Sequence, residues 1–292
     1  MTFRSRFLAV SLLAVVPFGA ACDVHVGENG VSLDVASGKA TEEWSRTYTL
    51  ARGGSLDIVN TNGAIVVTGA TGSQVEVKAT RTARAASDEE AQALLKETSI
   101  SEEVSAERVA LQTANGSGVL RGRRSVNVEY HVRVPAGVQI RVKTENGGIG
   151  LHDMDGTVTA STTNGGIRGT NLAGAYSAHI VNGGIVMEVA RATGPIDLDT
   201  VNGGIRLDVP VDLKADVEAH AVNGGVSADD TLTIASSDRS RTRLSGKLNG
   251  GGIKISATTV NGGVRIGLLK PGAAAADGEE ALQQNRVVVE KR

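Results

Sequence analysis

The chain is poor in aromatic residues. Phe, Trp and Tyr make up 2% of its 292 residues, and all of its phenylalanines (Phe3, Phe7 and Phe18) lie near the N-terminus. A globular β-sandwich usually fills its core with large aromatic rings. We therefore expect a thin core of Val, Ile, Leu and Ala, which favours a flattened coil of stacked strands.

Other absences narrow the possible functions. Cys22 is the only cysteine, which excludes an intramolecular disulfide and a cysteine-rich zinc site. The formal net charge of −2 is spread along the chain, so the basic surface that binds nucleic acid is missing. The sequence contains no phosphate-binding loop Gly-x-x-x-x-Gly-Lys-Ser/Thr, no His-Glu-x-x-His and no Gly-x-Ser-x-Gly. We expect no cofactor, no nucleic acid partner and no enzymatic activity.

Glycine, in contrast, is abundant and repeats in a fixed motif. The chain has 37 glycines, and Asn-Gly-Gly followed by Ile or Val recurs through its second half. The asparagines of these motifs are Asn146, Asn164, Asn182, Asn202, Asn223 and Asn261. Their steps are 18, 18, 20, 21 and 38 residues, and the last is close to two steps of about 19. Asn-Gly favours a turn because both residues accept positive φ. The period is typical of a solenoid and too short for a helix-pair repeat.

Apolar and polar residues alternate before each asparagine, which predicts that the apolar side chains face the core and the polar side chains face water. The residues six and four positions before it are apolar except Tyr176, and we expect them in the core: Ile140, Val142, Val158, Ala160, Tyr176, Ala178, Ile196, Leu198, Val217, Ala219, Ile255 and Ala257. The residues five positions before are polar and should face water. Copies stacked about 4.8 Å apart would share one core. The asparagines would then form a structural ladder, amide upon amide.

The N-terminus predicts export. Residues 1–21 have the basic, apolar and small-residue regions of a signal peptide, ending in Gly19-Ala20-Ala21 before Cys22. This ending resembles the lipobox of bacterial lipoproteins, in which the cysteine is lipidated, although Gly19 departs from the aliphatic residue usual there. Ordinary secretory cleavage and an uncleaved anchor are the alternatives. We expect an exported protein of the cell envelope, lipid-anchored at Cys22 and facing the periplasm or the surface.

The remaining chain divides into four parts. Residues 22–43 are predicted to be a tether, and residues 44–134 an N-terminal β region. A short helix is expected near 88–98, because Ser87 and Glu90 form a capping box. Residues 135–270 hold the Asn-Gly-Gly solenoid, with a loop at 236–243. Residues 271–292 are predicted to be a mobile tail.

The order of these features resembles a known family. The chain contains, in order, a strand with Asn62-Gly63, a helix insertion, the strand 126–130, the turn Pro135-Ala-Gly137 and the Asn-Gly-Gly repeats. This order is similar to that of the bacterial putative adhesin family of β-strand-repeat envelope proteins, a domain of unknown function. The similarity covers about residues 44–268. It implies an all-β, right-handed parallel β-solenoid (β-helix), here with rungs of about 19 residues and one inserted helix. The resemblance brings no catalytic residues.

One set of residues suggests a site. His179, Asp199 and His220 each lie three positions before their asparagine and would form an outward column if their copies were stacked in order. Imidazoles flanking a carboxylate could bind a divalent metal or form a ladder of hydrogen bonds. We favour the ladder, because alternating charge stabilises a stacked surface without a metal.

Two weaker patterns concern carboxylates. His152 to Gly156 faintly resembles a calcium loop but lacks the further carboxylates, so a turn is the better interpretation. Asp197 and Glu218, if on adjacent coils, would suit a retaining glycosidase.

We predict a non-catalytic, adhesin-like binding or surface-presentation lipoprotein. Its expected partners are the membrane, through its lipid, and an envelope polysaccharide or protein. End-to-end self-association through an exposed last coil near Leu268 is a further possibility. The alternatives are an envelope-stress signalling or scaffold lipoprotein and a polysaccharide-active β-helix enzyme.

Overall fold

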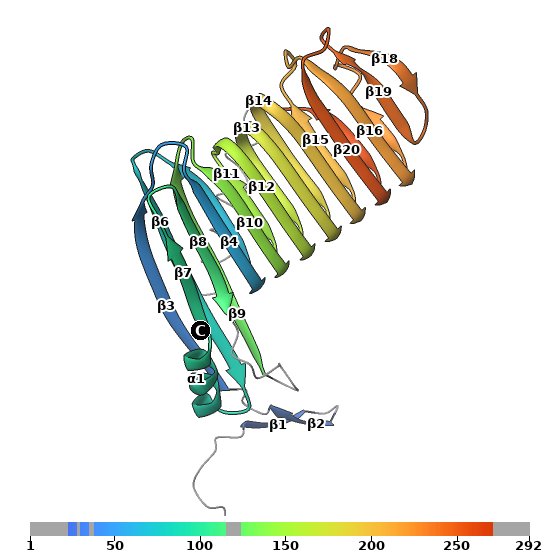
Figure 1. Cartoon of the computed structure of the whole chain (residues 1–292). Helices are drawn as coiled ribbons and strands as arrows, with labels where there is room; N and C mark the ends of the chain where they lie inside the picture. The colour runs from blue at the N-terminus through green and yellow to red at the C-terminus, as the bar shows by residue number, and fades with distance from the viewer. Residues whose placement is uncertain (1–22, 28–29, 35–37, 115–123, 271–292) are drawn as a thin grey trace, which may run out of the picture.

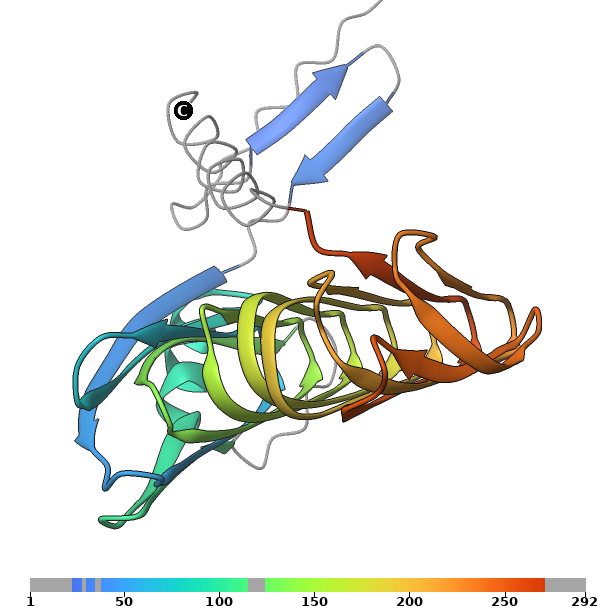
Figure 2. The ribbon, with the colours of Figure 1, turned by 90° about the horizontal axis from the view of Figure 1, so that it is seen from above.

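The computed structural model describes residues 23–27, 30–34, 38–114 and 124–270. A 19-stranded sheet curls around one elongated core (Figures 1 and 2). The single helix of the described residues lies at one end of the folded structure. Strands β1 (Asp23–Gly27) and β2 (Gly30–Asp34) form a separate antiparallel pair. None of the described helical segments has the length and apolar character needed to cross a membrane. The predicted signal peptide, Cys22 and the tail lie outside the described residues.

The coil is built from rungs of two strands joined at an Asn-Gly corner. The front wall contains the strands that end at the asparagines, and the rear wall contains those that begin after the corner. The rungs, in spatial order, are β4 (Ser55–Asn62) with β5 (Ile65–Ala70), β10 (Gln139–Asn146) with β11 (Ile149–His152), β12 (Asp155–Asn164) with the start of β13 (Ile167–Asn182), the end of β13 with the start of β14 (Ile185–Asn202), the end of β14 with β15 (Ile205–Val209), β20 (Ile253–Asn261) with β21 (Val264–Leu268), and β16 (Ala215–Asn223) with β17 (Val226–Ala228). All of these neighbours pair in parallel.

The last two rungs stack in the reverse of chain order. Asn202 pairs with Asn261, and Asn261 pairs with Asn223, so β20 lies between β14 and β16. The hairpin of β18 (Ile234–Arg239) and β19 (Arg243–Leu248) explains the reversal, since β19 pairs antiparallel with the free edge of β16. The returning chain then fills the remaining gap. The predicted loop at 236–243 is thus a hairpin, and Leu268 pairs with Val209 inside the stack instead of ending it.

The N-terminal end is antiparallel. Strands β3 (Gly38–Thr49), β6 (Gln74–Ala85) and β9 (Ser125–Pro135) pair in that order, and β9 joins the rear wall through β5. Strand β7 (Ser99–Val104) pairs with β8 (Arg108–Ala114), which continues the front wall beside β4. Because β3 begins at Gly38, the end of the predicted tether is part of the sheet.

The predicted helix is present as α1 (Asp88–Glu97). Its N-cap is Ser87, whose hydroxyl accepts a hydrogen bond from the Glu90 N–H at 3.3 Å. The helix buries Ala91, Leu94 and Leu95 and packs against β3 and β6. The capping box therefore located this helix correctly.

The predicted core columns are buried throughout, and they are Ile140, Val142, Val158, Ala160, Tyr176, Ala178, Ile196, Leu198, Val217, Ala219, Ile255 and Ala257. Tyr176 fits among aliphatic neighbours because its hydroxyl donates to the carbonyls of Met154 (3.0 Å) and Ala173 (2.8 Å). Burial raises the pKa of this phenol far above its ordinary value. One thin aliphatic core thus runs the length of the coil.

Each corner is bonded to the next through side chains. The asparagine amides form a continuous ladder, with Nδ2 to Oδ1 distances of 2.7–2.9 Å, through Asn62, Asn146, Asn164, Asn182, Asn202, Asn261 and Asn223. Behind it, buried threonines donate to glycine carbonyls of the neighbouring corner, as Thr144 does to Gly63 at 3.1 Å. The first glycine of the motif is required by close contact: a Cβ on Gly147 would lie 2.2 Å from the Gly63 carbonyl oxygen.

Candidate functional site

The outer face of the front wall carries columns of polar side chains, but not the predicted His179–Asp199–His220 column. His179 pairs in register with Asp199, whereas Asp199 pairs with Thr258 and Thr258 with His220. The prediction was wrong in this respect because it assumed that rungs stack in chain order. The inserted strand β20 separates His220 from the other two.

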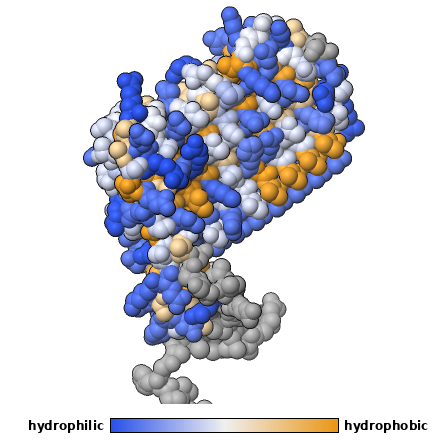
Figure 3. All heavy atoms as spheres, in the orientation of Figure 1, coloured by the Kyte–Doolittle hydropathy of each residue, from blue (hydrophilic) through white to orange (hydrophobic). Residues whose placement is uncertain are grey.

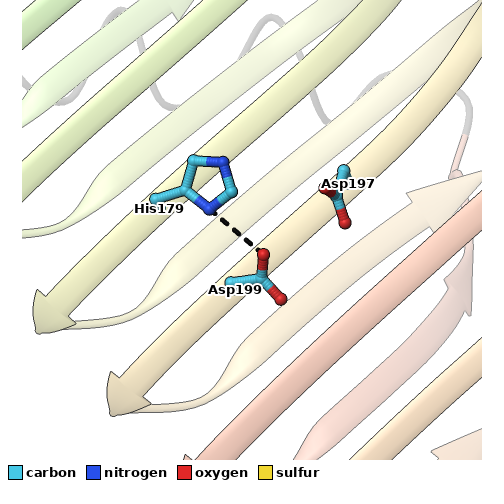
Figure 4. Close-up of side chains that lie close together, drawn as sticks. All are labelled: His179, Asp197 and Asp199. Carbon is cyan, nitrogen blue, oxygen red and sulfur yellow. Dashed lines mark ion pairs between the residues drawn. The ribbon is translucent and has the colours of Figure 1, made fainter.

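The structure brings a different third residue to this pair. His179, Asp197 and Asp199, here called the His179 cluster, offer ligand atoms that all lie within 4.8 Å of one another. The His179 Nδ1 is 3.1 Å from Asp199 Oδ2 (Figure 4). Asp197 joins them because residues two apart on a strand share a face. Periodicity alone places Asp197 in another column, five positions before its asparagine, and so does not predict its proximity to His179.

Hydrogen bonding and charge both act on the cluster. The other ring nitrogen of His179, Nε2, is 2.8 Å from the Ser177 hydroxyl. Burial is the largest cause that raises the pKa of Asp199 above its ordinary value, and the Asp197 carboxylate raises it further. His179 offsets part of the rise. The side chains of His179 and Asp199 remain 46% and 42% exposed. The cluster therefore concentrates negative charge where solvent ions can reach it.

A groove of about 310 Å³ lies next to the cluster. It crosses β12, β13, β14 and β20. Asp197 belongs to both features, and Ser177, which contacts His179, also lines the groove. The small outward side chains of successive rungs leave this space open. The outward residues that line it are Thr157, Thr159, Ala175, Ser177, Pro195, Asp197, Lys254 and Ser256. Four of these eight residues carry a hydroxyl group, one is an acid, one is a base, and Ala175 and Pro195 are apolar.

A wider hollow of about 540 Å³ lies nearer the hairpin, where Asp216, Glu218, Lys247 and Lys254 contribute charges of both signs. Glu218 and Asp197 are the two carboxylates that would suit a glycosidase if their coils were adjacent. In the structure Asp197 pairs with Ser256, and Ser256 with Glu218. The two carboxylates are therefore on strands separated by β20, so the adjacency on which that interpretation depended is wrong.

Comparison with protein families assigns the chain. The model of the family described as Toastrack DUF4097 matches residues 51–267. The chain belongs to this family. The matched region includes the coil, the groove and the His179 cluster, and it confirms the resemblance noted from the sequence to a family of unknown function.

Solved structures show more distant similarity to this Toastrack chain. A putative cell adhesion protein from Clostridium sporogenes is 13% identical over 78% of this chain and 100% of its own, with a TM-score of 0.41. A putative adhesin from Bacteroides fragilis is 12% identical over 78% and 97%, with a TM-score of 0.33. A putative lipid binding protein from Parabacteroides distasonis is 10% identical over 78% and 97%, with a TM-score of 0.25. We draw nothing further from similarities this low. Comparison with curated proteins gave no significant match.

The Toastrack coil also carries an apolar ridge. The residue before the corner asparagine is an exposed valine on neighbouring rungs. In spatial order these are Val181 (43% exposed), Val201 (41%), Val260 (37%) and Val222 (52%). This valine ridge is the orange row along the lower right edge of the coil in Figure 3. It borders the front wall at the ends of the strands that form the groove.

The segment from His152 to Gly156 contains the corner at Asp153 and Met154 that joins β11 to β12, so a turn is the correct interpretation. Its Asp153 has a φ of 53° and accepts a hydrogen bond from Asn171 at 2.8 Å, while Asp155 pairs with Arg191 at 3.2 Å. His152 Nδ1 lies 2.8 Å from the Thr170 hydroxyl. These contacts hold one corner against the next, which is a structural role.

Proposed function

We propose that this Toastrack protein is a non-catalytic, adhesin-like binding module of the cell envelope, and that the groove on its front wall binds an extended polysaccharide. The predicted signal peptide and lipobox support export and a lipid anchor at Cys22. The period of the repeats supports rungs of about 19 residues, and the family resemblance implies a right-handed coil. The observation that carries the proposal is a groove across neighbouring rungs whose lining combines four hydroxyl side chains, one acid and one base with apolar residues.

The lining of the groove suits sugar hydroxyls. Serine and threonine hydroxyls can both donate and accept hydrogen bonds, as sugar hydroxyls do. Asp197 adds a strong acceptor and Lys254 a donor at the same groove. Because the groove crosses β12, β13, β14 and β20, an extended chain would contact several rungs at once. The valine ridge offers an apolar surface at the border for the less polar face of a sugar ring.

Filling the groove tests the proposal. Thr159 lines it, whereas Thr47 is exposed on β3, at the antiparallel end of the structure and away from both the groove and the valine ridge. We expect Thr159→Arg to weaken binding to envelope polysaccharides at least about tenfold, or about 1.4 kcal/mol, and Thr47→Arg to bind as the parent does. Glycan arrays followed by calorimetry on the mature protein would measure this, with circular dichroism checking that both variants fold.

The proposal fails if the mature protein binds no envelope polysaccharide at micromolar concentrations, or if both variants bind equally well. Capture of a protein partner alone would favour the signalling or scaffold alternative. Anchoring is tested separately by the mass of the mature N-terminal peptide. A lipid-modified Cys22 supports the anchor, and an unmodified N-terminus contradicts it.

A further inference from the structure

The three side chains of the His179 cluster converge from two adjacent strands. The Nδ1 of His179 and Oδ2 of Asp199 are 3.1 Å apart, and a ligand atom of Asp197 completes a set within 4.8 Å. Zn²⁺ bonds of about 2.0–2.2 Å to nitrogen and oxygen place neighbouring ligand atoms roughly 3–3.5 Å apart. The histidine and Asp199 already have this separation. The Asp197 carboxylate, within 4.8 Å of the other two ligand atoms, would have to move closer on metal binding.

The surroundings orient the imidazole for metal binding. Without a metal, Nδ1–H donates to Asp199 Oδ2 at 3.1 Å. A metal would replace this proton, and Nε2–H could then donate to the Ser177 hydroxyl, which lies 2.8 Å away. Hydrogen bonds of this kind fix the tautomer and ring orientation of metal-binding histidines. The parallel ladder between β13 and β14 holds His179 opposite Asp199, so little ordering is needed on binding.

The charge of the cluster favours a cation. Asp197 and Asp199 lie on one face of β14, and their strand neighbours on β20 are the uncharged Ser256 and Thr258. Among the described ion pairs, neither carboxylate is neutralised by a lysine or an arginine. A divalent ion would neutralise both. An imidazole nitrogen with two carboxylate oxygens suits zinc better than magnesium or calcium, which prefer oxygen ligands alone.

We propose that His179, Asp197 and Asp199 form a zinc site on the front wall. Three protein ligands leave a coordination position open toward solvent beside the groove. This site goes beyond the proposed function and does not depend on it.

Titration of Zn²⁺ into the metal-free mature protein tests the site. We expect one zinc per chain, and His179→Gln or Asp197→Asn should weaken its binding at least about tenfold. Matched controls lie on β16, where His220 and Glu218 occupy the same positions relative to their asparagine as His179 and Ser177. His220→Gln and Glu218→Gln should leave the zinc affinity within about twofold of the parent.

Several outcomes would overturn the proposal. Absence of stoichiometric zinc binding would do so, as would a His179→Gln variant with parental affinity or a His220→Gln variant that loses zinc equally. Circular dichroism and metal-free thermal melts establish that each variant is folded, and Asp199→Asn provides a second, independent removal of a ligand. No glycan is present in the titration, so its failure and that of polysaccharide binding remain distinguishable.

Discussion

The coil from β4 to β15 stacks in chain order, whereas the two rungs that follow stack in reverse, yet both parts use the same bonds. The Thr200 hydroxyl donates to Gly183 at 3.0 Å within the ordered part, and Thr259 donates to Gly203 at 2.8 Å across the point of reversal. The asparagine ladder also continues through both parts. The corner motif thus determines that a rung stacks, but not which rung becomes its neighbour.

The reversal begins after β15. The segment 210–214 carries the chain past one rung position to β16, and the chain between β17 and β20 contains the β18–β19 hairpin. The hairpin covers the edge of β16 that the next rung would otherwise occupy. An uncovered edge would also be a template for pairing with another chain. The hairpin therefore covers the outer edge of β16, and the returning rung takes the inner edge.

The largest expected effects come from the close glycine contacts, which should be equally severe in both parts. A Cβ on Gly147 would lie 2.2 Å from the Gly63 carbonyl oxygen, and one on Gly224 would lie 1.7 Å from the Gly262 carbonyl oxygen. We expect Gly147→Ala and Gly224→Ala each to lower the free energy of unfolding by about 3 kcal/mol in urea titrations.

Gly148→Ala is the matched control for these substitutions. Its Cβ would lie 3.5 Å from the Gly166 carbonyl oxygen, an ordinary contact. This variant should lose less than about 1 kcal/mol. A mild effect of Gly224→Ala would mean that the reversed rungs are less closely packed than the ordered ones.

The asparagine ladder should show a smaller effect of similar size in the two parts. Asn164 bonds to Asn146 and Asn182, and Asn261 bonds to Asn202 and Asn223. Each alanine substitution removes two partly exposed hydrogen bonds, so we expect a loss of about 1–2 kcal/mol from Asn164→Ala and from Asn261→Ala. Thermal and urea unfolding would measure it. A neutral Asn261→Ala would contradict the insertion of that rung.

The smallest expected effect concerns pH. Burial and Asp197 raise the pKa of Asp199 above its ordinary 3.8, so the folded state holds this proton more tightly than the unfolded chain does. Stability is therefore lost as the pH rises through the folded pKa. In EDTA, Asp199→Asn should melt as the parent does near pH 3.5, and slightly higher at pH 7.

Asp57→Asn provides the comparison for this pH effect. Asp57 pairs with Arg108 at 2.7 Å and with Arg141 at 3.4 Å, at the end of the coil that stacks in order. Loss of these pairs should lower the melting temperature at pH 7. Equal destabilisation by the two substitutions would contradict the account of Asp199.

Sequence reasoning succeeded wherever a residue's role depended only on its distance from a corner. Ile140, Leu198 and Ile255 are buried and the asparagines form a ladder because each rung repeats one local pattern. The reversal was not predictable, since the motifs at Asn223 and Asn261 are alike. Strand β7 was missed because nearly all of its side chains are exposed, which leaves no alternation to recognise. The composition of the His179 cluster was missed because it requires both the correct order and contacts between columns.

The order of the rungs is tested most directly by disulfide formation. In a Cys22→Ala background, cysteines would replace Val201 and either Val260 or Val222, all exposed residues of the valine ridge. Adjacent strands are about 4.8 Å apart, and a disulfide cannot join Cα atoms more than about 7 Å apart. After mild oxidation, the structure predicts a 201–260 disulfide and none between 201 and 222. A 201–222 disulfide, with none between 201 and 260, would show that the rungs stack in chain order and would contradict the account.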